Sequence, residues 1–150
     1  MTKKKFNEVI DFAINGEKDA VKFYQELQAK VKFQAQIEML KEFENMENGH
    51  VAILENIRNK GFEKIEIKEV TDLHISDYII DIVPTEDMNY QDILIIAMKK
   101  EEKANKLYIE MANNFPGTEL EQLFRRLAAE EAEHKLKFEK LYDDEVLREN

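Results

Sequence analysis

Apolar residues recur every three or four positions along four stretches of the chain, the spacing that places side chains on one face of a helix. In the first stretch the recurring positions are Phe6, Ile10, Ala13, Glu17, Ala20, Tyr24 and Leu27. In the second they are Leu40, Phe43, Glu47, His50, Leu54 and Ile57. Both series return 84 positions later, as Tyr90, Leu94, Ala97, Glu101, Ala104, Tyr108 and Met111 and then as Phe124, Leu127, Glu131, His134, Phe138 and Leu141. The pattern therefore predicts two copies of a helical hairpin.

Turn residues mark several ends of the predicted helices. The stretch "NNFPG" at 113–117 ends the third helix, and Thr118 with Glu121 three residues later has the pattern of a capping box for the fourth. Asn89 opens the third helix, with Asp92 in its first turn. The turn of the first hairpin is poorly marked, and the repeat alone places it near residues 30–33.

The chain is predicted to be one all-α domain over residues 1–150, with hairpins at about 4–59 and 89–143. The scarcity of turn formers, four Gly and two Pro, favours such long helices. A connector at about 60–88 joins the hairpins. A helix of about 27 residues is roughly 40 Å long, a span that this connector can cross. Helices two and three would then run parallel, giving a four-helix bundle with one long crossover connection.

Six polar side chains interrupt the apolar stripes, each near the middle of its predicted helix. They are Glu17, Glu47, His50, Glu101, Glu131 and His134. Residues at mid-helix share one layer of a four-helix bundle, so these side chains are expected to converge. Four buried carboxylates would be unstable without cations between them. Two divalent ions would neutralise them, and carboxylate oxygens with imidazole nitrogens suit iron, manganese or zinc.

A Glu and a His three residues apart lie on one face of a helix, so both can bind the same ion. Glu47 and Glu131 are predicted to bridge the two ions. Ligand pairs complete the two sites: Glu17 with His50, and Glu101 with His134. The third histidine, His74, has no Glu three residues before it and is predicted not to be a ligand. The alternative is a bundle with a metal-free polar layer.

Composition narrows the classes of function. The absence of Cys excludes disulfides, iron–sulfur clusters and thiolate metal sites. A net charge of −10 argues against nucleic-acid binding, which needs a basic surface. The longest apolar run, residues 93–98, is far shorter than a membrane span, and no secretory signal is visible. We expect a soluble, cytoplasmic protein with no membrane partner.

The combination of Glu17, "ENGH" at 47–50, Glu101 and "EAEH" at 131–134 resembles the ferritin-like di-iron carboxylate proteins, in particular their rubrerythrin branch. The resemblance covers about 5–58 and 89–142, and it implies a ferritin-like bundle that holds two iron ions. "NGEKDAVKFY" and "KKEEKANKLY" resemble rubrerythrin helices in which a Tyr follows the ligand Glu by seven residues. By that resemblance Tyr24 and Tyr108 would hydrogen-bond to ligand carboxylates; packing alone is the alternative role.

The function that this resemblance implies is a di-iron oxidoreductase reducing hydrogen peroxide or dioxygen, with Glu17 and Glu101 shifting to admit the oxidant. Rubrerythrins carry a further carboxylate where this chain has Ala104, which puts the peroxidase mechanism in question. They also carry a Cys-ligated rubredoxin domain, so the electron donor here is expected to be a separate protein. The alternatives are a ferroxidase or iron-handling protein, and a structural bundle with zinc or no metal. A bundle of this kind is expected to form a homodimer.

Overall fold

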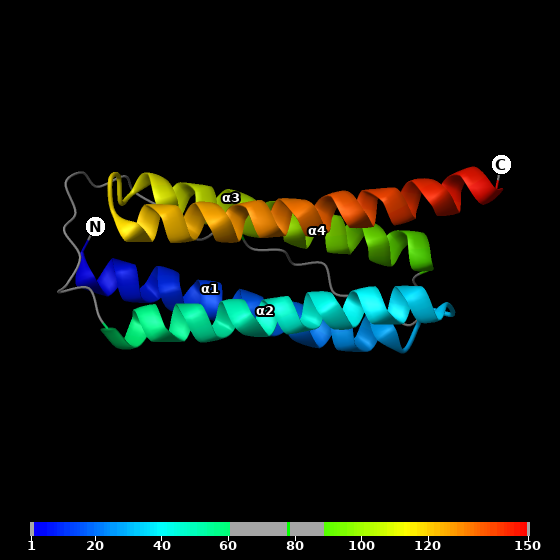
Figure 1. Cartoon of the computed structure of the whole chain (residues 1–150), viewed down its shortest axis with the longest axis horizontal. Helices are drawn as coiled ribbons and strands as arrows, with labels where there is room; N and C mark the ends of the chain where they lie inside the picture. Colours follow the sequence, from blue (N-terminus) through cyan, green and yellow to red (C-terminus); the bar gives the residue numbers. More distant parts are fainter. Residues whose placement is uncertain (1, 61–77, 79–88, 150) are drawn as a thin grey trace. The chain divides into compact units, whose positions relative to one another are not determined.

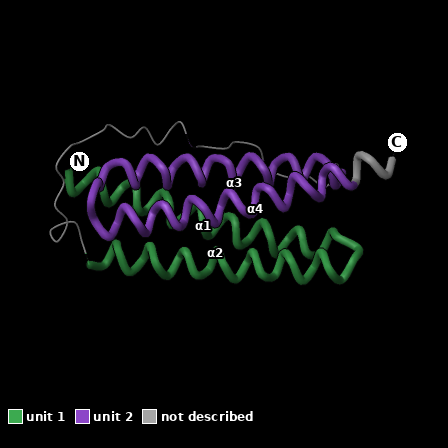
Figure 2. The backbone as a smooth tube through the Cα atoms, turned by 45° about the horizontal axis from the view of Figure 1, so that its top comes forward, with its two compact units in different colours: residues 1–72 green, residues 73–150 purple. Residues whose placement is uncertain are grey.

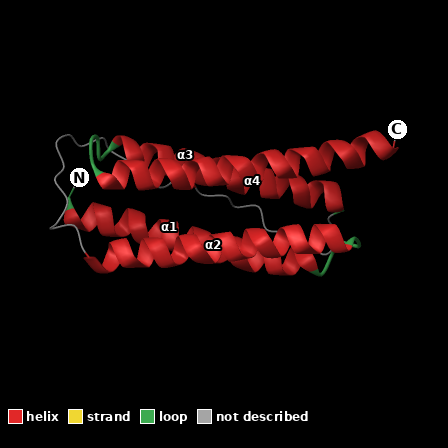
Figure 3. Cartoon of the chain, viewed as in Figure 1, coloured by secondary structure: helices red, strands yellow, loops and turns green. Residues whose placement is uncertain are grey.

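A computed structural model of the chain describes residues 2–60, 78 and 89–149, and side chains as far as residue 144. Four helices follow one another in the order α1 (Lys3–Gln28), α2 (Gln34–Lys60), α3 (Tyr90–Asn113) and α4 (Glu119–Glu149) (Figure 1). Over these ranges the backbone is helix and short turn, without a strand (Figure 3). None of the described helices is both long and apolar enough to cross a membrane.

The chain divides into two compact units, residues 1–72 and 73–150 (Figure 2). In the first, α1 packs against α2, and in the second, α3 packs against α4. A short turn joins the helices of each pair, so both units are antiparallel helical hairpins. The expected hairpin repeat is therefore confirmed by the order and the packing of the helices.

The first hairpin turns where the repeat predicted. Thr2 caps the start of α1 by accepting a hydrogen bond from the Lys5 amide at 3.1 Å. Helix α1 ends at Gln28 and α2 begins at Gln34. The carbonyl of Phe33 accepts the first helical bond of α2, from the Ile37 amide at 3.1 Å, so Phe33 occupies the N-cap position. Helix α2 thus starts at a residue whose side chain has no acceptor for the free amides of the first turn.

The second hairpin is capped at both helix starts. Asn89 accepts a bond from the Asp92 amide at 2.9 Å, as predicted for the start of α3. Thr118 Oγ1 accepts from the Glu121 amide at 3.2 Å, which confirms the first half of the predicted capping box. The Glu121 carboxylate accepts from the Gly117 amide at 3.3 Å, one residue before the expected donor. The Thr118 amide is already bonded to the carbonyl of Phe115, at 3.3 Å.

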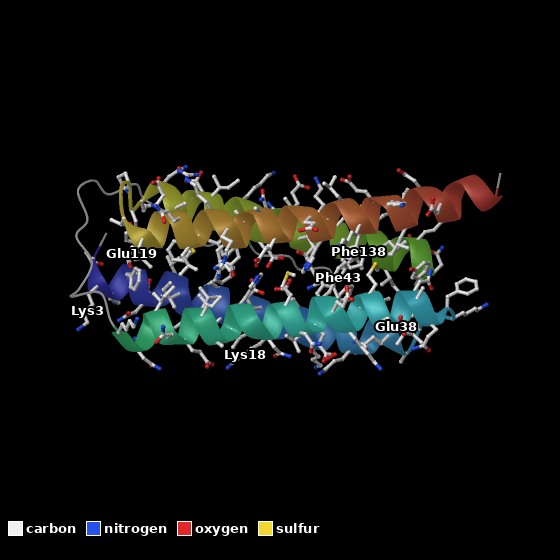
Figure 4. The ribbon with its side chains drawn as sticks, in the orientation of Figure 1. Lys3, Lys18, Glu38, Phe43, Glu119 and Phe138 are labelled. Atoms are coloured by element: carbon white, nitrogen blue, oxygen red, sulfur yellow. The ribbon has the colours of Figure 1, made fainter. Side chains whose placement is uncertain are left out.

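Apolar side chains line the inner face of each hairpin, with charged side chains on the outer face. Phe43 on α2 and Phe138 on α4 are fully buried, whereas Lys18 and Glu38 are exposed (Figure 4). The buried aromatic rings pack edge to face in the first unit, where Tyr24 contacts Phe43 with 5.8 Å between ring centroids. This separation of faces is what the three- and four-residue spacing predicts.

Two sequence expectations lie outside the described residues, and one described helix runs past its expected end. The connector predicted at about 60–88 is outside the described residues apart from Lys60 and Tyr78, and so is His74. Helix α4 continues to Glu149, past the expected hairpin boundary near 143. The sequence after residue 141 contains no Gly or Pro to end the helix.

Candidate metal centre

The first hairpin brings two carboxylates and one imidazole together at its middle. Glu17 comes from α1, and Glu47 and His50 come from α2 one helical turn apart. His50 Nδ1 lies 3.4 Å from Glu17 Oε2 and 3.4 Å from Glu47 Oε2. Each residue offers one ligand atom, and these three atoms lie within 4.8 Å of one another. All three residues are at most 3% exposed.

The second hairpin repeats the arrangement. Glu101 comes from α3, and Glu131 and His134 come from α4. His134 Nδ1 lies 3.7 Å from Glu101 Oε2, and one ligand atom of each residue lies within 4.8 Å of the other two. These residues are at most 2% exposed. The prediction that all six polar side chains face inward is confirmed, while their role as ligands stays a prediction.

Apolar layers bound each cluster along its helices. On α2, Phe43 precedes Glu47 by one turn and Leu54 follows His50 by one turn, and both are buried. On α4, Leu127 and Phe138 occupy the equivalent positions and are fully buried. Each polar layer is therefore enclosed in a low-dielectric environment, where charge–charge interactions are stronger than in water.

The donor set fits divalent transition-metal ions. Carboxylate oxygens and imidazole nitrogens are ligands for iron, manganese and zinc. No lysine or arginine among the described residues is buried, so no such side chain neutralises the carboxylates from inside the core. In the second hairpin Glu101 Oε2 is buried and accepts no hydrogen bond from the described residues. An oxygen in this environment has the position and the free electron pairs of a metal ligand.

Tyr24 and Tyr108 are both buried, at 1% exposure, seven residues after Glu17 and Glu101. The ring of Tyr108 stacks on Phe124, with 6.4 Å between centroids. The packing role is thus present for both tyrosines. The hydrogen bond from each hydroxyl to a ligand carboxylate, which the resemblance implies, stays a prediction.

The neighbours of the predicted ligands belong to the surface. Glu102 bonds to Lys106 at 3.0 Å, and the hydrogen bond and charge of that lysine hold the pKa of Glu102 below its ordinary value. Glu130 lies 3.9 Å from Arg126 and is partly exposed. Ala104, one turn after Glu101, is also partly exposed. The ion pairs of Glu102 and Glu130 agree with the solvated role that helical geometry gives them.

Sequence reasoning missed one polar contact beside the second cluster. Asn105 Nδ2 on α3 donates to the carbonyl of Ala128 on α4 at 2.7 Å, in a partly buried position. This bond ties the turn that follows Glu101 to the turn that precedes Glu131. Asn is unfavourable inside a helix because its side chain competes for backbone groups. The presence of Asn105 in the middle of a predicted helix was therefore the sequence signal for a side-chain contact at that position.

Comparisons with known proteins agree with this geometry. The family model described as Rubrerythrin matches residues 8–80 and 92–150. A hypothetical protein from Pyrococcus furiosus, Pfu-1136390-001, has a solved structure that matches with a TM-score of 0.69 and 28% sequence identity, over 91% of this chain and 87% of that one. No curated protein matches. Since the family model covers well over half of the sequence, the chain belongs to the rubrerythrin family, and its all-α fold is a ferritin-like four-helix bundle.

Proposed function

We propose that the chain is a non-haem di-iron oxidoreductase that reduces hydrogen peroxide or dioxygen with electrons from a separate donor protein. The observation that carries this proposal is the duplicated cluster, two carboxylates and one histidine buried at the middle of each hairpin. Membership of the rubrerythrin family, whose members are di-iron proteins, favours iron over manganese or zinc.

The six donors are proposed to hold two ions between them. Glu17 with His50 would serve one ion, Glu101 with His134 would serve the other, and Glu47 and Glu131 would bridge both. Four carboxylates carry four negative charges, which two divalent cations neutralise. This balance removes the cost of several kcal/mol that each unpaired buried charge would carry.

Iron bound there would supply two electrons to the oxidant. The chain's own residues would hold and shield the reacting atoms. The apolar layers formed by side chains such as Phe43 and Phe138 would keep bulk water from the ligands. Glu17 and Glu101, which do not bridge in this proposal, would shift to admit the oxidant. The hydroxyls of Tyr24 and Tyr108 would donate to ligand carboxylates and fix their orientation.

The electrons would come from another protein, because this chain has no cysteine with which to bind an iron–sulfur or rubredoxin-type centre of its own. A cytoplasmic setting and pairing into a homodimer belong to the same proposal. A dimer would elute from gel filtration near twice 17.8 kDa.

The test begins with metal-free protein loaded anaerobically with two equivalents of Fe(II), followed by hydrogen peroxide. One peroxide accepts two electrons and two protons to give two waters, so we expect one peroxide consumed per two irons and a new ferric absorbance in the near ultraviolet. The Glu47→Ala and Glu131→Ala variants are expected to lose both signals, and His74→Ala to keep them. If loaded wild-type protein shows neither ferric absorbance nor peroxide consumption, the oxidoreductase proposal fails.

Two measurements on the same preparation separate the alternatives. Iron storage requires a shell of many subunits, so a dimer in gel filtration excludes a storage cage. Elemental analysis of protein purified without added metal distinguishes iron from zinc or from no metal. A chain that holds zinc alone and binds no Fe(II) would be a structural bundle.

A further inference from the structure

Two glycines lie inside the helices of the first hairpin, each directly before a predicted ligand. Gly16 precedes Glu17 in α1, and Gly49 precedes His50 in α2. The equivalent positions of the second hairpin, 84 residues on, are Lys100 and Glu133. A glycine in a helix interior shifts the local folding equilibrium roughly two- to fivefold toward the open state, relative to alanine.

Nothing in the described structure requires a glycine at either position. A Cβ atom at Gly16 or at Gly49 would meet no atom within 4 Å, and both residues are exposed. Neither has the positive φ that Gly117 adopts in the turn of the second hairpin. The remaining physical consequence of these two glycines is a lower local stability of α1 and α2.

The second hairpin has a side-chain hydrogen bond between its helices at the level of the ligands. The bond of 2.7 Å from Asn105 to the carbonyl of Ala128 joins α3 to α4 beside the predicted ligands. The residue equivalent to Asn105 is Val21, whose side chain has no hydrogen-bond donor.

Ion pairs at this level occur in both hairpins. Lys135, next to His134, lies 4.0 Å from Glu102 on α3 and 3.5 Å from Glu139 on α4. In the first hairpin the positions equivalent to these two glutamates hold Lys18 and Glu55, a direct pair at 3.6 Å. The side chains of that pair are 58% and 50% exposed, and those of Lys135 and Glu102 are 33% and 42% exposed, so ion pairs contribute little to stability in either hairpin. Next to equivalent ligands, the two hairpins thus differ in the two glycines of the first and in the Asn105 bond of the second.

Building on the proposed function, we propose that the first hairpin is the mobile half of the metal centre. Gly16 and Gly49 act as positioning residues, because they allow α1 and α2 to open locally beside Glu17 and His50. These two ligands, rather than Glu101 and His134, then release and rebind when metal ions enter or leave. Because the same three-residue ligand pattern occurs in both hairpins, the asymmetry comes from the glycines beside the ligands of the first hairpin and from the Asn105 bond between α3 and α4.

The test compares matched substitutions in the two hairpins. Gly16→Ala and Gly49→Ala restore helix propensity in the first, and Lys100→Ala and Glu133→Ala are surface controls at the equivalent positions. Amide hydrogen exchange of the metal-free protein, corrected for intrinsic rates, measures local opening. Release of bound Zn²⁺ to a chelator measures ligand release without any redox step.

In the metal-free wild-type protein we expect faster exchange around residues 14–20 than around residues 98–104. Each Gly→Ala substitution is expected to slow amide exchange in its own helix about two- to fivefold. It is also expected to slow the faster phase of zinc release, which we assign to the first hairpin, by a similar factor. The controls are expected to leave both rates unchanged. The converse double variant, Lys100→Gly with Glu133→Gly, is expected to speed exchange in the second hairpin.

Equal exchange in the two hairpins of the wild-type protein would overturn this inference, as would slower exchange without slower zinc release. An equal effect of the Lys100→Ala and Glu133→Ala controls would also overturn it. The exchange and zinc-release measurements involve no redox step, so their outcome does not depend on whether the protein reduces peroxide. A protein that binds zinc and shows the predicted exchange pattern, but consumes no peroxide, would retain the mobile first hairpin and lose only the redox chemistry.

Discussion

The two hairpins keep the same chemistry at their middles and differ at their turns. Each buries two glutamates, one histidine and one tyrosine at equivalent positions. At the turn of the first hairpin, Phe33 is 57% exposed and no acidic residue lies in the first turn of α2. At the turn of the second hairpin, Phe115 is buried and Thr118 caps α4. The ligand positions are shared, so the turns are a second source of difference in stability between the hairpins, beside the glycines and the Asn105 bond at the ligand level.

The largest expected effect tests whether the ligand clusters of the two hairpins contribute equally to metal binding. Glu47→Ala and Glu131→Ala should each cause the loss of bound metal, because each removes a proposed bridging carboxylate. In the metal-free state each variant should be more stable by about 1–3 kcal/mol, since a buried carboxylate is removed. Elemental analysis and urea unfolding in a chelator measure the two effects. Retention of both ions by one variant alone would show that the halves of the site are not equivalent.

The second expected effect compares the aromatic residues of the two turns. Phe115→Ala should lower the free energy of unfolding by about 3–5 kcal/mol, because it leaves a cavity beside Phe124, whose ring centroid lies 6.0 Å away. Phe33→Ala should change it by no more than about 0.5 kcal/mol, because the side chain is mostly in water. Guanidinium unfolding of the metal-free protein compares the two. If Phe33→Ala lowered the free energy of unfolding as much as Phe115→Ala, the ring of Phe33 would have to be covered in solution.

Features that depend on periodicity could be predicted from the sequence. The four helices, the buried stripe and the inward positions of residues such as Glu17 and His134 follow from the spacing of three and four residues. The end of α3 and the cap of α4 follow from Asn, Pro, Gly and Thr at fixed offsets. These signals are local, so one segment of sequence is enough to carry each of them.

Features that depend on which helix faces which could not be predicted in the same way. The bond from Asn105 to Ala128 joins residues on different helices, and no spacing within either helix indicates it. The Glu121 carboxylate accepts from the amide of Gly117, while the Thr118 amide donates to Phe115, a choice between neighbouring amides that the capping pattern does not specify. The first turn was located through the repeat alone, since Phe33 occupies a cap position where a polar residue is usual.

A smaller effect is expected when the N-cap of α4 is removed and a polar N-cap is given to α2. Thr118→Ala should lower the free energy of unfolding by about 1 kcal/mol, because the amide of Glu121 loses its acceptor. Phe33→Thr should raise it by about 0.5–1 kcal/mol, because it supplies a cap that α2 does not obtain from Phe33. Thermal and urea unfolding of the metal-free variants provide the comparison. If Phe33→Thr is destabilising, the exposed ring has a structural role that the cap does not replace.

The smallest expected effect is a pH dependence confined to the turn of the second hairpin. The hydrogen bond from Arg125, and then the one from the Gly117 amide, hold the pKa of Glu121 below its ordinary value. A carboxyl group whose pKa is lower in the folded state stabilises that state above its unfolded pKa, and the contribution disappears as the pH falls through the folded pKa. The equivalent residue of the first hairpin is Ile37, which cannot titrate.

The difference in unfolding free energy between wild type and Glu121→Gln should therefore be constant from neutral pH down to about 4.3, the ordinary pKa of Glu. Below that pH it should shrink toward zero. Arg125→Met should make this contribution smaller and let its loss finish at a higher pH, because removing the larger of the two causes raises the folded pKa of Glu121. Urea unfolding at a series of pH values measures both effects. Because Glu121 lies near the surface, added salt should weaken the Arg125 contribution, whereas the bond from the Gly117 amide should persist. A difference that stays the same down to pH 2 would mean that the carboxylate is not engaged in solution, and the ends of the two hairpins would then differ in packing and capping but not in charge.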